Sequence, residues 1–224
     1  MENIILYFAP GSCARVTLSA LEEIQCAYEG RALNLYKGEQ KQPEYLSLNP
    51  KGQVPALVVG DSVLTENPAI LSYLNDRFPE AGLFPDNHKV FNQFACISDL
   101  MWISGALHPQ VRQVIRPSYY TSGDEDGVRA LGKEKVGQFL RQFEDRFAAN
   151  EWWYGSKWSI VDVYVFWLTT IVEFAGMDIS AYAAILRHRA AVRARPSFQR
   201  ALAKELDAVE AKTIKLRLPE GMSL

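Results

Sequence analysis

The stretch Asn49-Pro50-Lys51-Gly52-Gln53-Val54-Pro55-Ala56-Leu57, followed shortly by Thr65-Glu66-Asn67, decides the fold. Pro55 interrupts an apolar strand pattern, and a proline cannot donate a hydrogen bond to a neighbouring strand. We therefore expect Pro55 at the start of the strand, with the backbone of Val54 free to pair with a peptide-like ligand. An ordinary edge-strand proline explains these residues equally well. The acid and amide at the helix start just beyond favour a site for a small charged peptide.

The patterns around this stretch predict a sheet with helices. Apolar strand patterns alternate with helical patterns, and Gly60-Asp61 is typical of a hairpin turn. This order predicts a mixed four-stranded sheet with a parallel pair across the first helix. The expected strands are 4–8, 28–35, 54–59 and 63–65, and the expected helices are 13–25 and 66–77.

The remainder of the chain is helical in pattern after a connector that contains proline and glycine. The prediction is α/β plus all-α, with a domain at 1–79, a linker at 80–88 and an all-helical domain at 89–224. Ser159-Ile160-Val161-Asp162 has the spacing of a capping box before a helix that is apolar on all sides, which indicates a central helix. This motif is a folding feature. The expected helices are 90–116, 127–149, 160–174, 182–194 and 197–208.

Composition excludes whole classes of partner. Of the 224 residues, 48% are hydrophobic and 22% charged, and the net charge is -2, as in an ordinary globular protein without a basic stripe for nucleic acid. No apolar run is long enough to cross a bilayer, and no export signal is visible. Three cysteines without metal-ligand spacing indicate a reducing compartment. We expect a cytoplasmic protein with no metal, nucleic-acid partner or membrane partner.

Cys13 is the best candidate for chemistry. The first strand runs through a short turn into the first helix, which places Ser12 and Cys13 at the helix N-terminus, where an anion such as a thiolate is favoured. Arg15 could add to that effect. Residue 16 is valine, so there is no second cysteine in a C-x-x-C spacing. The alternative is that Cys13 is a small apolar filler and Ser12 only an N-cap.

The other cysteines and two of the histidines have structural interpretations. Cys26 and Cys96 lie on apolar faces and are expected to pack in cores. His88, at the connector, and His188, in a basic helical segment, are expected on the surface.

In their order and spacing, these features resemble the cytosolic glutathione S-transferase family, and the resemblance covers the whole chain. The segment Tyr7-Phe8-Ala9-Pro10-Gly11-Ser12-Cys13 is most similar to the bacterial beta class, which has a cysteine after a Pro-Gly pair. The resemblance implies a thioredoxin-like first domain, a homodimer and a role in detoxification. It also implies glutathione as a cosubstrate and no prosthetic group.

The resemblance assigns roles along the glutathione molecule. Val54 would pair with its cysteinyl part as a short β-addition beside a cis Pro55. The γ-glutamyl end would be held by Glu66 and Asn67, and the other carboxylate by Lys51 and Gln53. The thiol would be activated by Cys13, Ser12 or Tyr7, and we favour Cys13 because it alone could also form a mixed disulfide.

The second substrate is expected to be a hydrophobic electrophile beside the long first helix of the second domain. Its site would involve Met101, Trp102, Gly105 and His108, with Tyr119 or Tyr120 nearby. Aromatic residues at helical spacing are also typical of a core.

The sequence departs from the family pattern at three positions. Asn67 stands where a Ser or Gly is usual, and Ala14 where the beta class often has Ser. Pro109 follows His108 where a Lys is usual, and this proline is expected to kink the helix.

Three functions remain open at this level. The first is addition of the glutathione thiolate to an electrophile. The second is a glutathione-dependent thiol-disulfide oxidoreductase that acts through a mixed disulfide at Cys13. The third is a binding protein without turnover, which Gln53, Pro55 and Glu66 together disfavour because the fold alone does not require all three.

Overall fold

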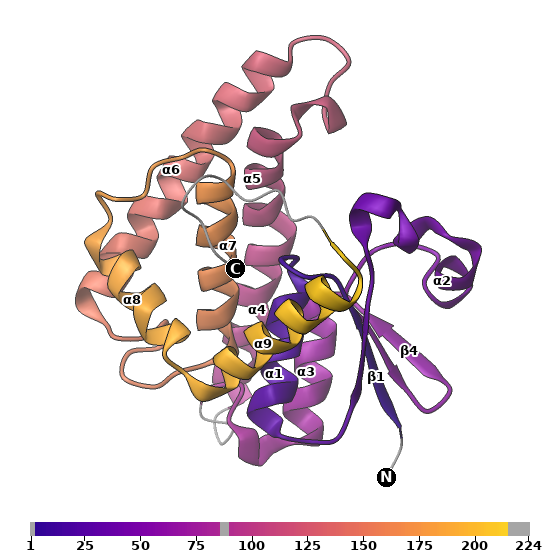
Figure 1. Ribbon diagram of the computed structural model, residues 1–224. Helices are drawn as coiled ribbons and strands as arrows, with labels where there is room; N and C mark the ends of the chain where they lie inside the picture. Colours follow the sequence, from indigo (N-terminus) through magenta and orange to yellow (C-terminus); the bar gives the residue numbers. More distant parts are fainter. Residues whose placement is uncertain (1–2, 86–89, 215–224) are drawn as a thin grey trace. The chain divides into compact units, whose positions relative to one another are not determined.

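The computed structural model describes residues 3–85 and 90–214, so the connector His88 lies outside the described residues (Figure 1). The chain divides into two compact units. The first comprises 1–83 together with 194–224, and the second comprises 84–193.

The first unit holds the predicted mixed sheet, with strand order β2-β1-β3-β4. β1 runs parallel to β2 and antiparallel to β3, which pairs with β4 through the expected hairpin. Figure 1 shows α1 and α3 side by side next to the sheet, with α2 apart from them. The strands are β1 Ile4–Phe8, β2 Glu29–Ala32, β3 Ala56–Val59 and β4 Ser62–Thr65, and the helices are α1 Ala14–Ile24, α2 Pro43–Leu48, α3 Asn67–Arg77 and α9 Pro196–Ala211.

The core of this unit lies between the sheet and its helices. Alternate residues of β1 are buried, as expected for a strand with one face on the core. Helix α1 is buried over most of its length because it also packs against α3 and α9. The fully buried side chains include Leu6, Leu18, Leu57, Ile70 and Leu74. A short helix, α2, and two 3-10 turns at 35–41 occupy a region that sequence patterns left as a loop.

By its contacts, helix α9 groups with the sheet, although the sequence predicts a domain of 89–224 that contains it. Its buried residues Phe198, Ala201, Leu202 and Glu205 follow helical spacing and form one face. That face packs against α1. The physical reason is that the apolar stripe of α9 completes the burial of α1, although the two helices are far apart in sequence.

The second unit is helical. It contains α4 Val90–Trp102, a π-helical turn at Ile103–Leu107, α5 His108–Ile115, α6 Glu125–Ala149, α7 Ile160–Phe174 and α8 Ala183–Arg193. Within the described residues, no helix has the length and apolar character needed to cross a membrane.

The predicted capping box begins α7, the central helix of this unit. Both reciprocal bonds between Ser159 and Asp162 are present. Asp162 is fully buried, and its carboxylate also accepts from the backbone N–H of Trp153 at 2.7 Å. His188 lies 2.9 Å from the same carboxylate and is 1% exposed, so the expectation of a surface histidine was wrong. The reason is that His188 faces the interior of the unit, where its ring stacks on that of Phe147 with 3.8 Å between the ring centroids.

Candidate functional site

The turn that carries Cys13 follows β1 directly. Gly11 has a φ of 77°, a left-handed conformation that favours glycine. The Ser12 hydroxyl donates to the Ala9 carbonyl at 2.7 Å and accepts from the Ala14 N–H at 3.2 Å. The hydroxyl therefore caps the turn, and it could donate to a ligand thiolate only after losing its bond to Ala9. Cys13 occupies the N-cap position of α1.

The thiol of Cys13 points at the backbone edge that precedes β3. Its sulfur lies 3.7 Å from the carbonyl oxygen of Val54. The Val54–Pro55 peptide bond is cis, as the family resemblance implies. The Cys13 thiol and the backbone segment predicted to bind a peptide are therefore adjacent.

The loop before this edge is shaped by close packing. Gly52 has a φ of 59°, and a Cβ there would lie 2.9 Å from the carbonyl oxygen of Gln40. Its N–H donates to the carbonyl of Asn49 at 2.9 Å, which closes a tight turn. Only glycine fits this combination of conformation and close approach.

The carbonyl of Gln53 is held from two sides. The Asn49 amide donates to it at 2.8 Å and the Tyr45 hydroxyl at 2.5 Å. Asn49 is 2% exposed, and Tyr45 is also buried. These two side chains fix the backbone just before Val54.

The predicted γ-glutamyl end of the site carries an exposed ion pair. The ammonium of Lys51 lies 2.9 Å from the Glu66 carboxylate and 2.9 Å from the Thr65 hydroxyl. Lys51 and Glu66 were assigned to opposite ends of glutathione, but the structure brings their side chains together. Glu66 has a φ of 72°, a conformation rare for a residue with a side chain and one that clusters at ligand sites.

Asn67 points away from this exposed end. Its side-chain oxygen accepts from the Thr17 hydroxyl at 2.7 Å, and its side-chain nitrogen donates to the Cys13 carbonyl at 3.0 Å. The residue is only 3% exposed. Its amide is thus engaged inside the unit, whereas the sequence prediction placed it on the glutamyl carboxylate.

Tyr7 has partners on the other face of the sheet. It alternates with the buried Leu6 and Phe8, and its ring lies 5.5 Å from that of Tyr45 in α2. Its hydroxyl accepts from Arg31 at 2.8 Å. This packing agrees with the interpretation of Tyr7 as a strand residue.

Arg15 has a counterion, so its charge is not available to Cys13 in the way we expected. The guanidinium lies 2.6 and 2.9 Å from one carboxylate oxygen of Glu205 in α9. The other oxygen accepts from the Gly11 N–H at 3.2 Å. Burial raises the pKa of Glu205, while Arg15 and the Gly11 N–H act in the opposite direction by stabilising the carboxylate. The first and last helices of the unit therefore meet at the Cys13 turn.

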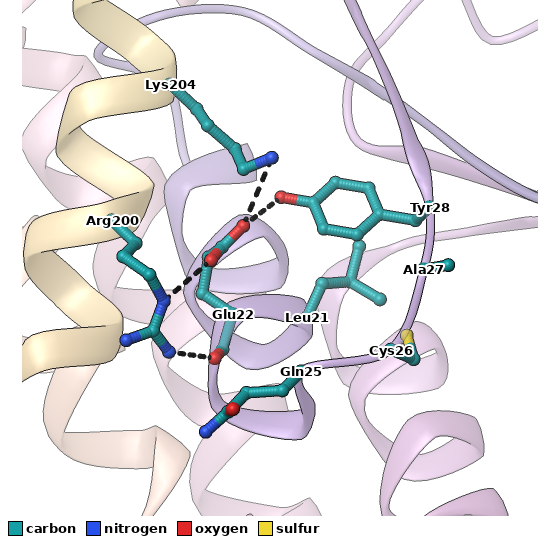
Figure 2. A pocket seen from close by; sticks show the side chains of 8 residues that line it. All are labelled: Leu21, Glu22, Gln25, Cys26, Ala27, Tyr28, Arg200 and Lys204. Atoms are coloured by element: carbon teal, nitrogen blue, oxygen red, sulfur yellow. Dashed lines mark hydrogen bonds and ion pairs between the residues drawn. The ribbon is translucent and has the colours of Figure 1, made fainter.

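A separate hollow of about 350 Å³ lies further along the contact between α1 and α9 (Figure 2). Glu22 occupies it and binds Arg200 at 3.0 Å, Lys204 at 3.5 Å and the Tyr28 hydroxyl at 2.6 Å. Cys26 also lines it, half-buried, and burial raises the pKa of its thiol. Glu22 of α1 thus joins two cations of α9, which fastens the two helices together at this hollow. Cys96, by contrast, is fully buried, as expected.

The predicted electrophile residues differ in their surroundings within the second unit. Met101 is 60% exposed, and Gly105 has open space around its Cα. Trp102 is half-buried, with its ring 6.2 Å from Phe143 and 6.5 Å from Trp153. Trp102 therefore packs partly as a core residue. Tyr119 and Tyr120 are both exposed.

His108 begins α5 directly after the π turn. Its N–H donates to the carbonyl of Ile103, five residues earlier. Pro109, the next residue, has no N–H to donate within the helix. The sequence predicts a kink at this proline, and the structure has a wider π-helical turn just before it. Burial and, to a lesser extent, the nearby Arg112 lower the pKa of His108 to about 3. His108 is therefore neutral at pH 7, with its ring 4.7 Å from that of Trp167.

Sequence reasoning missed Thr17, Tyr45 and Glu205. Thr17 lies one helical turn after Cys13, so helical spacing could have indicated it. Glu205 follows Phe198, Ala201 and Leu202 on an apolar face, and an acid at a core position is a signal for a buried partner. No pattern in the sequence identifies that partner as Arg15.

Comparison with known proteins identifies the family to which this fold belongs. Residues 2–76 match the family model described as glutathione S-transferase, N-terminal domain, and residues 110–205 match the C-terminal domain model. Maleylacetoacetate isomerase of Pseudomonas aeruginosa is 30% identical over 204 residues, covering 89% of this chain and 94% of that protein.

Two solved structures are also similar. A glutathione transferase homologue from Sulfitobacter with bound glutathione has a TM-score of 0.80 and 27% identity, over 96% of this chain and 100% of that chain. The bacterial beta class glutathione S-transferase of Sphingomonas chungbukensis has a TM-score of 0.79 and 29% identity, over 90% and 98% of the two chains.

The chain belongs to the glutathione S-transferase family. It is a glutathione transferase, with a thioredoxin-like sheet domain and a helical C-terminal domain.

Proposed function

We propose that this enzyme adds the thiolate of glutathione to a hydrophobic electrophile, with Cys13 facing the glutathione sulfur. The observation that supports this is the convergence of three groups in one unit. The Cys13 thiol lies 3.7 Å from the Val54 carbonyl, and the helix start at Glu66 is joined to the Cys13 carbonyl through Asn67. A thiol, a backbone segment before β3 and a carboxylate are the groups that a short acidic peptide with a thiol requires.

The proposed binding mode follows the site. The backbone of Val54 pairs with the cysteinyl part of glutathione, and Glu66 binds the ammonium of the γ-glutamyl end. The γ-glutamyl carboxylate approaches the N–H of Asn67, the first residue of α3, where backbone donors lack helical partners. Lys51 and Gln53 receive the other carboxylate. Lys51 then exchanges its bond with Glu66 for one with the ligand.

The electrophile is proposed to bind near Met101, Gly105 and His108. Since His108 is neutral at pH 7, it can accept or donate one hydrogen bond without adding charge. The exposed thioether and the neutral imidazole suit an apolar acceptor. The Cys13-after-Pro-Gly segment favours assignment to the beta class.

A second candidate function is isomerisation. It is favoured by the similarity to the relative named maleylacetoacetate isomerase, because the match covers 94% of that relative's length. Its first step is the same attack, by the glutathione thiolate on a carbon–carbon double bond conjugated to a carbonyl. Rotation about the resulting single bond and expulsion of the thiolate then return glutathione unchanged. The two reactions are separated by measuring whether glutathione is consumed in proportion to product.

Calorimetric titration with glutathione tests the proposal. Glu66→Ala removes a charged partner, and such bonds are worth about 1.5–3 kcal/mol, so the affinity should fall about 10- to 100-fold. Glu80→Ala, which removes an exposed carboxylate of the same unit, is the matched control and should bind normally. No heat with the unaltered protein would refute the proposed site.

The role of Cys13 is tested separately, with Cys13→Ser. Loss of addition to 1-chloro-2,4-dinitrobenzene supports the proposed role. Retained addition with loss of thiol transfer from glutathione disulfide would instead favour the oxidoreductase function.

We also propose a cytoplasmic homodimer. The small number of cysteines and their lack of metal-ligand spacing support a reducing compartment, and the family resemblance supports the dimer. Light scattering after size-exclusion chromatography measures the mass, which for a dimer is twice the 25.3 kDa of one chain.

A further inference from the structure

Asn67 forms a direct link between the two ends of the site. It is the first residue of α3 and follows Glu66, whose side chain is exposed. Its own side chain is 3% exposed and reaches α1. Glu66, whose side chain is exposed, is therefore adjacent in sequence to the residue that bonds the backbone of Cys13.

The orientation of the Asn67 amide is determined by chemistry. The Cys13 carbonyl can only accept a hydrogen bond, so the NH₂ group must face it, at 3.0 Å. The amide oxygen then faces the Thr17 hydroxyl, at 2.7 Å, which donates. Since neither end can be exchanged, the side chain holds α1 and α3 in one arrangement.

The carbonyl that Asn67 binds belongs to Cys13, the residue just before α1. That carbonyl also accepts from the Val16 N–H at 3.1 Å, within the first turn of the helix. Cys13 occupies the N-cap with a φ of -60° and a ψ of -12°. Holding this carbonyl fixes the first turn, and with it the backbone donors that favour a thiolate at a helix N-terminus.

We propose that Asn67, supported by Thr17, is a positioning residue for the Cys13 thiol. The inference rests on the proposed function, because it concerns the same thiol, and it adds a role that differs from binding the glutamyl carboxylate. A serine at this position has a single hydroxyl, which supplies one donor and is too short to bridge both partners.

The test is the rate at which iodoacetamide alkylates Cys13, measured without glutathione from pH 5 to 9. Mass spectrometry of the Cys13 peptide follows the reaction. In Asn67→Ser the rate at pH 7 should fall about two- to fivefold, the range that helix N-terminal interactions supply, and the midpoint of the pH profile should move to higher pH. Thr17→Val should change both in the same direction by less, because it removes only the support of the Asn67 amide.

Two controls separate positioning from general loosening. Cys26, half-buried in the same unit, should keep its alkylation rate in both variants. Thr169→Val removes a buried hydroxyl that bonds its own helix in the second unit, at 2.9 Å from the Val165 carbonyl, and should leave Cys13 unaffected.

The outcomes distinguish this inference from the proposed function. An unchanged Cys13 profile in folded Asn67→Ser and Thr17→Val, judged by circular dichroism, would overturn the positioning role. If Asn67→Ser does not fold, Thr17→Val alone decides. Absence of glutathione binding to the unaltered protein would overturn the proposed function, yet a slowed Cys13 reaction would still support the positioning role.

Discussion

The ion pairs Arg15–Glu205 and Lys51–Glu66 belong to the same unit and have similar lengths, 2.6 and 2.9 Å, in opposite surroundings. The side chains of the first pair are 2% and 0% exposed, and those of the second are 51% and 56% exposed. Breaking a buried pair leaves an unpartnered charge in the interior, whereas an exposed pair contributes only about 0–1 kcal/mol and opens easily. The Cys13 turn is therefore held by a buried ion pair, while the pair at Glu66 is free to open in solvent.

The largest effect is expected from Glu205→Ala. This change strands the Arg15 guanidinium in the interior and removes the acceptor of the Gly11 N–H, so the free energy of unfolding should fall by about 3–5 kcal/mol. Urea denaturation measures it. The double variant Arg15→Met/Glu205→Leu should recover most of the loss, because no charge is left unpartnered. A loss of under about 1 kcal/mol in the single variant would mean that the pair behaves like a surface pair.

An intermediate effect on stability is expected from His108, a partly buried group without an opposite charge. Its pKa of about 3 lies below the value of about 6.5 expected in the unfolded chain, so between these pH values only the unfolded state binds the proton. Stability should therefore fall on acidification, at most by about 1.4 kcal/mol per pH unit from this residue. Comparing urea midpoints at pH 7 and pH 5 checks this.

The control for His108 is His108→Leu, which should show a shallower loss of stability between the same two pH values. An identical pH dependence in both proteins would contradict the low pKa. The comparison shows whether burial, assisted by the nearby cation of Arg112, is enough to keep the imidazole of His108 uncharged.

The smallest effect on stability is expected from Lys51→Ala. Removal of an exposed partner should change the free energy of unfolding by less than about 1 kcal/mol. Glutathione affinity should nevertheless fall, since Lys51 is proposed to receive a carboxylate. Lys133→Ala, an exposed lysine of α6, is the reference for both measurements. A stability loss as large as that of Glu205→Ala would remove the distinction between the two pairs.

The sheet and most helices were predictable because their signals are local. The β1–Cys13 turn, the Pro55 strand start, the Gly60-Asp61 hairpin and the Ser159–Asp162 box each depend on a few adjacent residues. Helix α9 was also predicted as a helix, but its packing against α1 in the first unit was not. An apolar helix face packs against whichever core the folded chain brings to it. That core is formed by residues distant in sequence, so a single sequence does not identify it.

The N-terminal position of Cys13 on α1 was predictable from the short turn after β1, and the cis Val54–Pro55 bond was implied by the family resemblance. The binding and catalytic roles of Cys13, Val54, Pro55 and Glu66 stay predictions. The direction of the Asn67 side chain was not predictable, because it depends on Thr17 and the Cys13 carbonyl being within reach. The burial of His188 was not predicted for the same reason. Basic residues next to it in sequence do not show which side chains of other helices pack against it.

The meeting of Glu205 with the Cys13 turn also has a consequence for the order of biosynthesis. The carboxylate lies 194 residues after Gly11 and 190 after Arg15, so β1 and α1 leave the ribosome long before their partner is made. Until α9 is translated, Arg15 has no Glu205 to neutralise it and must remain hydrated. The contact of Glu205 with the Cys13 turn can thus form only after α9 has been made, later than the local bonds of Ser12 that shape the same turn.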